Sequence, residues 1–166
     1  MEGPRTQARQ RLLWLGRMEA ANVLFVPAVV VYALWSFERR LPSVVVWAGL
    51  LPMLWLLVQG STYWLWKAES IEGRDGPFPA ARFRSLERSN PVILFVSAVV
   101  VAVFFRRPDA WLGVLAWAMA VLEHINYYKV QLMHDTAADW RRLMRDRRLR
   151  PSALAKDMRR TGNQSL

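Results

Sequence analysis

Residues 44–66 read VVVWAGLLPMLWLLVQGSTYWLW and contain no charged side chain. A helix needs about 20 apolar residues, each adding about 1.5 Å, to cross the roughly 30 Å hydrocarbon core of a bilayer. This run has that length and ends at Lys67. A lone strand could not satisfy its backbone polar groups in lipid, so the run predicts a transmembrane helix.

Three other apolar runs approach the same length, and they cover residues 20–37, 91–105 and 110–130. Between the second and third runs, residues 67–90 form a loop, and its glycines and prolines predict an irregular connector over 69–88. Basic segments, residues 1–19 and 135–166, flank a membrane domain at 20–134. The sequence therefore predicts an all-α integral membrane protein with four transmembrane helices.

The composition agrees with a membrane protein. The chain is 54% hydrophobic, yet its 23 Lys and Arg against 13 Asp and Glu give a net charge of +10. In a soluble domain that charge would suggest nucleic-acid binding. Here the basic residues lie between the apolar runs, so nucleic acid is an unlikely partner. The absence of Cys excludes disulfides, thiolate metal ligands and a Cys nucleophile.

The distribution of basic residues predicts the orientation. Of the 23 Lys and Arg, only Arg39, Arg40, Arg106 and Arg107 lie in the two loops on one side of the four spans. Cytoplasmic loops carry the excess of Lys and Arg. Both termini and the 67–90 loop are therefore predicted to lie in the cytoplasm, with the chain in the inner (plasma) membrane.

The chain also shows an internal repeat. The octapeptide LFVPAVVV at 24–31 recurs as LFVSAVVV at 94–101, with a single difference. Spans two and four align without gaps, and this alignment matches Trp47, Gly49, Leu51 and Tyr63 with Trp111, Gly113, Leu115 and Tyr127. Chance similarity between apolar runs is the alternative. The repeat predicts two tandem parallel helical hairpins that form a four-helix bundle.

Polar side chains gather at the predicted cytoplasmic ends of the spans. An ionisable group inside a span is costly, so it normally faces the bundle and finds a partner. Glu123 lies deepest, with Gln59, Tyr63 or asparagines as its expected partners, and Tyr127 shares its helix face. The candidate ligand-binding residues are Glu19, Asn22, Gln59, Tyr63, Glu87, Asn90, Glu123, His124, Asn126, Tyr127 and His134. Two interpretations stay open: a polar pocket, or hydrogen bonds that only join the helices.

Catalysis and metal binding are weaker interpretations of the same residues. Glu123, His124 or His134 would act as a general base, with tyrosine hydroxyls as donors. The two histidines lie about 15 Å apart along one helix, so they cannot ligate one ion. A carboxylate-rich site from Glu19, Glu87, Glu123 and His124 is an alternative, but it lacks the Glu-x-x-His pairs of di-iron bundles. We therefore predict no metal site, and the sequence identifies no cofactor.

The C-terminal segment 135–166 is strongly basic. Such a segment beside a membrane is expected to contact anionic lipids at the cytoplasmic leaflet, although it also serves as a topology signal. The candidate lipid-binding residues are Trp140, Arg141, Arg142, Arg145, Arg147 and Arg148.

The leading functional interpretation is a non-enzymatic, bacterial-type inner-membrane protein. It would bind or transport a small polar ligand or a lipid headgroup through a cytoplasm-facing pocket around Glu123. A membrane-embedded enzyme and a structural scaffold without a small-molecule site are the alternatives. Gly49 and Gly113 add a possible homodimer, because small residues let helices approach closely.

Overall fold

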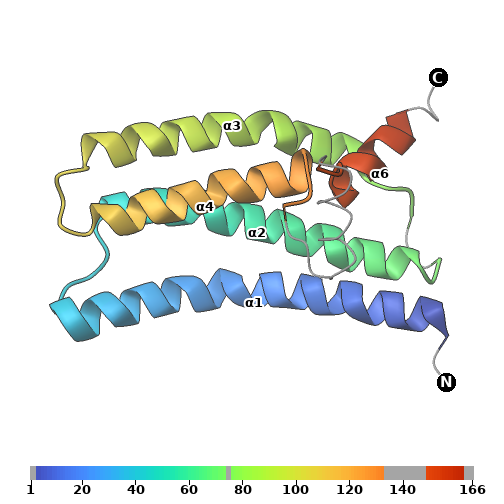
Figure 1. The fold of residues 1–166 in the computed structure, drawn as a ribbon, viewed down its shortest axis with the longest axis horizontal. Coiled ribbons are helices and arrows are strands. Elements are labelled where there is room, and N and C mark those ends of the chain that lie inside the picture. Colours follow the sequence, from blue (N-terminus) through green and yellow to red (C-terminus); the bar gives the residue numbers. More distant parts are fainter. Residues whose placement is uncertain (1–2, 74–75, 133–148, 163–166) are drawn as a thin grey trace.

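The computed structural model describes residues 3–73, 76–132 and 149–162. In those ranges the chain forms the helices α1 (Pro4–Glu38), α2 (Val44–Ser70), α3 (Ala80–Val103), α4 (Ala110–Tyr128) and α6 (Ala153–Gly162). No strand is present in the same ranges, apart from a single bridge between Val130 and Pro151. The predicted all-helical fold is confirmed. Figure 1 shows the four long helices side by side, with the N-terminus, the α2–α3 turn and α6 at one end.

Three helices, α1, α2 and α3, are long and apolar enough to cross a membrane. This supports the predicted membrane character of the chain. α4 has 19 residues, but its last turns contain Glu123, His124 and Asn126, which lower its apolar character. Large apolar side chains on the outside of α1 and α3, among them Phe25 and Phe95, are exposed as expected of a lipid-facing surface.

The segment between α2 and α3 differs from the prediction. An irregular connector was expected over 69–88, but α3 begins at Ala80, so the connector is much shorter. Phe83 explains the difference: it is buried and stacks on Phe78 with ring centroids 5.6 Å apart. It also meets Tyr63 edge to face at 6.0 Å. Because these aromatic contacts bury its side chain, the first turn of α3 is fixed by packing that local sequence does not reveal.

α2 is the central helix, and its backbone comes close to the backbone of α4 where Gly49 faces Gly113. A Cβ on Gly49 would overlap the carbonyl oxygen of Gly113, and a Cβ on Gly113 would overlap that of Val45. Only glycine at both positions permits this approach. The two glycines are buried within one chain, so they do not offer a surface to a second copy.

A buried carboxylate joins two loops at the end of the bundle away from the N-terminus and α6. Asp109, just before α4, accepts hydrogen bonds from the Ser43 backbone N–H at 3.0 Å and from the Ser43 hydroxyl at 2.8 Å. Burial alone would raise the pKa of Asp109, but the Ser43 bonds and the charge of Arg40 hold it below its ordinary value of 3.8. The loop before α2 is thereby tied to the loop before α4.

α6 turns the end of the chain back onto the bundle. Its apolar residues Leu154 and Met158 are buried in the core, against α3 and α4. Its basic residues Lys156, Arg159 and Arg160 remain exposed. The sequence predicted a basic segment over 135–166, with a second basic piece after Pro151, and its contact with the leaflet stays a prediction. Residues 153–162 dock on the bundle because one face of this short helix is apolar.

Candidate ligand cavity

A buried amide pair joins three helices. Gln59 of α2 and Asn90 of α3 exchange two side-chain hydrogen bonds, of 3.1 and 3.0 Å. The hydroxyl of Tyr128, at the end of α4, donates a third bond of 2.5 Å to Gln59 Oε1. All three side chains are buried. For the two predicted site residues in this cluster, the geometry matches the interpretation in which hydrogen bonds join the helices.

The neighbours of Glu123 differ from most of those expected. Of the predicted partners, only an asparagine bonds it: Asn126 Nδ2 lies 3.5 Å from Glu123 Oε2. Gln59 bonds to Asn90, where two amides satisfy each other's donors and acceptors, and Tyr63 bonds to a carboxylate of α6. Glu123 is therefore separate from the amide cluster and faces a different part of the bundle.

Glu19 of α1 and Tyr127 of α4 meet over Gly60 of α2. A Cβ on residue 60 would overlap both Glu19 Oε2 and the Tyr127 hydroxyl, so the glycine makes room for them. The same hydroxyl interacts with the carboxyls of both Glu19 and Glu123. Trp64 Nε1 donates a 2.9 Å hydrogen bond to Glu19 Oε1. Among the described residues, buried Glu19 Oε2 has no hydrogen-bond partner of normal geometry.

A cavity of about 410 Å³ lies beside this cluster. We call it the carboxylate cavity. Glu19 and Trp64 both line it, and its walls are largely apolar, as is typical of small-molecule sites. The residues that line it are Ala8, Arg11, Leu12, Leu15, Glu19, Tyr63, Trp64, Asn126, Tyr127, Gln131, Ser152, Ala153 and Leu154.

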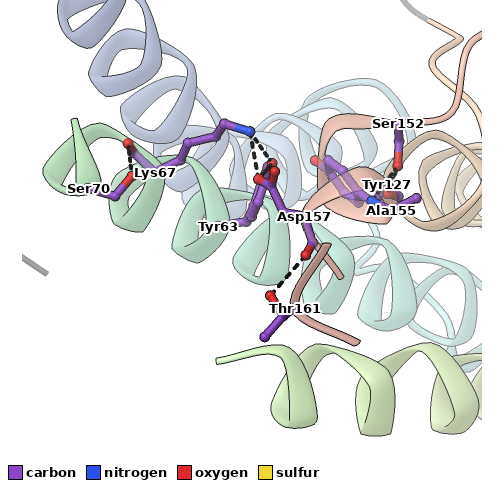
Figure 2. A network of polar contacts seen from close by, with 8 residues as sticks. All are labelled: Tyr63, Lys67, Ser70, Tyr127, Ser152, Ala155, Asp157 and Thr161. Atoms are coloured by element: carbon purple, nitrogen blue, oxygen red, sulfur yellow. Dashed lines mark hydrogen bonds and ion pairs between the residues drawn. The ribbon is translucent and has the colours of Figure 1, made fainter. Parts of the chain in front are cut away.

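One wall of the carboxylate cavity comes from the segment that leads into α6, and an ion pair holds that segment in place. Figure 2 shows that Tyr63, Lys67 and Asp157 meet at one point, where Lys67 Nζ also donates to the Tyr63 hydroxyl at 2.8 Å. Asp157 Oδ2 accepts from the Tyr63 hydroxyl and from Lys67 Nζ, each at 2.7 Å. The hydroxyl of Ser152 also donates to the carbonyl of Tyr127, which fixes the start of α6 to the end of α4.

The remaining predicted residues fall outside this cavity. His124 is buried on the adjacent face of α4, with its ring 5.2 Å from that of Tyr128. Glu87 forms an ion pair of 2.7 Å with Lys129. Asn22 is partly buried on α1 and does not line the cavity. His134 and the predicted lipid-binding residues, Trp140, Arg141, Arg142, Arg145, Arg147 and Arg148, lie outside the described residues.

The geometry separates the acidic groups that a shared catalytic or metal site would need. Glu123 belongs to the cluster around Tyr127, whereas His124 interacts with Glu87 of α3. Within the described ranges, no group of three or more His, Cys, Asp or Glu could hold a metal ion. The arrangement can accept hydrogen bonds from a donor placed beside Glu19.

The residues that sequence reasoning missed lie on elements that were not expected to meet. Trp64 and Arg11 line the carboxylate cavity, and Asp157 holds its wall. Trp64 follows the predicted Tyr63, so its position at the end of a span was a usable signal. Nothing local indicated Asp157. Comparison with models of protein families, with curated proteins and with solved structures finds no match.

Proposed function

We propose that the chain is a four-span inner-membrane protein that binds a small organic cation in its carboxylate cavity, on the cytoplasmic side. Two findings support the span count: α4 packs along the central helix α2, and its 19 residues extend over about 28 Å. The cavity lies at the end of the bundle that holds the N-terminus, the α2–α3 turn and α6 (Figure 1). Most of the described Lys and Arg lie at that end, and the excess of basic residues in cytoplasmic loops supports a cytoplasmic position for it.

The orientation can be tested with single cysteines because the natural sequence has none. Gly76→Cys would lie in the predicted cytoplasmic loop, and Arg106→Cys in a predicted periplasmic loop. A maleimide that cannot cross membranes should label Arg106→Cys on intact spheroplasts, whose inner membrane is exposed to the reagent. It should label Gly76→Cys only after the membrane is permeabilised. The unsubstituted protein is the unlabelled control, and the reverse pattern would contradict the orientation.

The observation that carries the ligand proposal is the buried carboxyl of Glu19 beside a cavity, where no described residue supplies a paired cation. A buried carboxylate oxygen is costly unless it accepts a hydrogen bond or pairs with a cation. Two carboxyls, Glu19 and Glu123, share the hydroxyl of Tyr127, and no described Lys or Arg forms an ion pair with either. Arg11 also lines the cavity, so the preference for a positively charged ligand rests on the position of the Glu19 carboxyl and not on the net charge of the lining.

The other cavity walls narrow the class of cation. The indole of Trp64 lies next to the carboxyl of Glu19, and aromatic rings attract cations through their electron-rich faces. Leu12, Leu15 and Leu154 provide apolar walls. A primary ammonium group with a short hydrocarbon chain matches both parts: its N–H groups donate to Glu19, and its chain lies against the leucines.

The ligand proposal is tested with three eight-carbon probes: n-octylammonium, n-octanol and octanoate. The protein is placed in phosphatidylcholine nanodiscs, and binding is measured by calorimetry against empty nanodiscs. We expect saturable binding of octylammonium alone. Glu19→Gln should weaken it about tenfold or more, because a hydrogen bond to a charged group contributes roughly 1.5 to 3 kcal/mol.

Glu87→Gln is the matched control, since it makes the same substitution on another helix, at a residue that does not line the carboxylate cavity. It should bind octylammonium as the unsubstituted protein does. Equal binding of octanol, or an unchanged affinity in Glu19→Gln, would show that the probe only partitions into apolar surface and would refute the proposal.

A further inference from the structure

A second cavity, of about 420 Å³, lies on the other side of the chain segment that enters α6. We call it the basic cavity. Arg84 of α3, Lys129 at the end of α4 and Arg159 of α6 all line it. Tyr128 and Met158 contribute buried surface to its floor. The two cavities share no lining residue.

The charge of the basic cavity favours an anion. Among the described lining residues the one acidic side chain, Glu87, is already paired with Lys129, at 2.7 Å. An ammonium group has three donors, so Lys129 keeps others available. No ion pair of Arg84 or Arg159 is found with any residue that the structure describes. Two guanidinium groups from different helices thus face one space without a described counter-charge, and guanidinium matches phosphate oxygens well.

One exposed face of α3 begins with basic residues beside the basic cavity and continues with apolar residues. The spacing of a helix places on this face Arg84, Arg88, Phe95 and Val99. All four are exposed, Phe95 by 69% and Val99 by 46%. Phe95 lies about 16 Å above Arg84 along the helix axis, and that separation resembles the reach of an acyl chain. An anionic group at Arg84 and a hydrocarbon chain along Phe95 and Val99 would fit a single amphipathic molecule.

We infer that the basic cavity binds the phosphodiester headgroup of an anionic glycerophospholipid. Arg84 and Arg159 hold the phosphate oxygens, Lys129 contributes a third cation, and an acyl chain lies on the exposed face of α3. Basic pockets between transmembrane helices on the cytoplasmic side suit such headgroups. The inference rests on the proposed four-span arrangement but uses no residue of the carboxylate cavity.

The test uses the purified full chain in a neutral detergent. Three probes are titrated separately: dioleoyl phosphatidylglycerol, dioleoyl phosphatidylcholine and inorganic phosphate. Native mass spectrometry counts retained lipid, and thermal unfolding reports stabilisation. We expect phosphatidylglycerol to bind at least tenfold more tightly than phosphatidylcholine, and inorganic phosphate to have no effect on unfolding. Arg84→Gln/Arg159→Gln should weaken phosphatidylglycerol binding about tenfold or more.

The matched control is Arg82→Gln/Arg160→Gln, which removes the same charge from the same two helices at exposed positions outside the cavity. It should retain phosphatidylglycerol binding. Equal losses in both double variants would show general attraction to a basic surface and would overturn the site. Stabilisation by inorganic phosphate alone would identify a soluble phosphate site and would overturn the lipid assignment.

The octylammonium measurement separates this inference from the proposed function. If octylammonium binds but phosphatidylglycerol does not bind selectively, the lipid site is refuted and the ligand proposal for the carboxylate cavity stands. If octylammonium fails to bind while phosphatidylglycerol binds selectively, the ligand proposal fails and the lipid site stands.

Discussion

Replacing Gly113 with alanine is expected to destabilise the folded protein by about 3 kcal/mol or more. Alanine at this position would gain about 1 kcal/mol of helix propensity. The added methyl group, however, would overlap the carbonyl oxygen of Val45, which belongs to the backbone of α2 and cannot rotate away. The two central helices must therefore separate, and the contacts along their shared length are loosened. The steric effect exceeds the gain in propensity.

The measurement is unfolding of the purified protein in mixed micelles with increasing dodecyl sulfate. Gly49→Ala should behave like Gly113→Ala, since its Cβ would overlap the Gly113 carbonyl from the other side. Gly76→Ala is the control because no atom lies within 4 Å of the position of its Cβ. If Gly113→Ala were as stable as the Gly76→Ala control, the close helix crossing would be wrong.

Gln59→Leu is expected to lower the free energy of unfolding by about 2 to 3 kcal/mol. The substitution removes three hydrogen bonds at once, to Asn90 and from Tyr128, and bonds between membrane helices contribute about 0.6 to 1.7 kcal/mol each. It also leaves the amide of Asn90 and the hydroxyl of Tyr128 buried without those partners, which adds a desolvation penalty.

A triple variant tests that reason. Gln59→Leu/Asn90→Leu/Tyr128→Phe removes every member of the cluster and leaves no orphaned polar group behind. It should be more stable than Gln59→Leu alone, because replacing all partners by apolar groups of similar shape is nearly neutral. The same unfolding assay compares the two. A triple variant less stable than the single one would mean that the three side chains act through packing and not through their hydrogen bonds.

Local sequence patterns predicted much of the architecture. The long run at 44–66 became the buried central helix, and the spacing of Glu123 and Tyr127 placed both on one face of α4. His124 and Tyr128 likewise occupy the adjacent face. These features depend on helical periodicity within a single element, so they could be derived without knowledge of the fold.

The contacts that build the carboxylate cavity could not be derived in this way. Tyr63 and Asp157 lie far apart in the sequence, and no periodic pattern links them. In the sequence, nothing distinguishes Trp64 from the other tryptophans near the ends of the spans. Its role depends on α1, which brings Glu19 within hydrogen-bonding distance. The helical start of α3 likewise depends on Phe83 packing against Phe78. Each of these features requires tertiary contacts that local propensity does not encode.

The position of Ser152, Ala153 and Leu154 in the cavity wall has a consequence for biogenesis. Chains are synthesised from the N-terminus, so in the proposed four-span arrangement α1 to α4 can enter the bilayer before residues 152–162 leave the ribosome. Until that last helix docks through Asp157, the carboxylate cavity lacks one side. If the cavity binds a ligand as proposed, a newly inserted bundle would hold its spans in place before its binding site is complete, and the order of translation would separate membrane insertion from ligand binding.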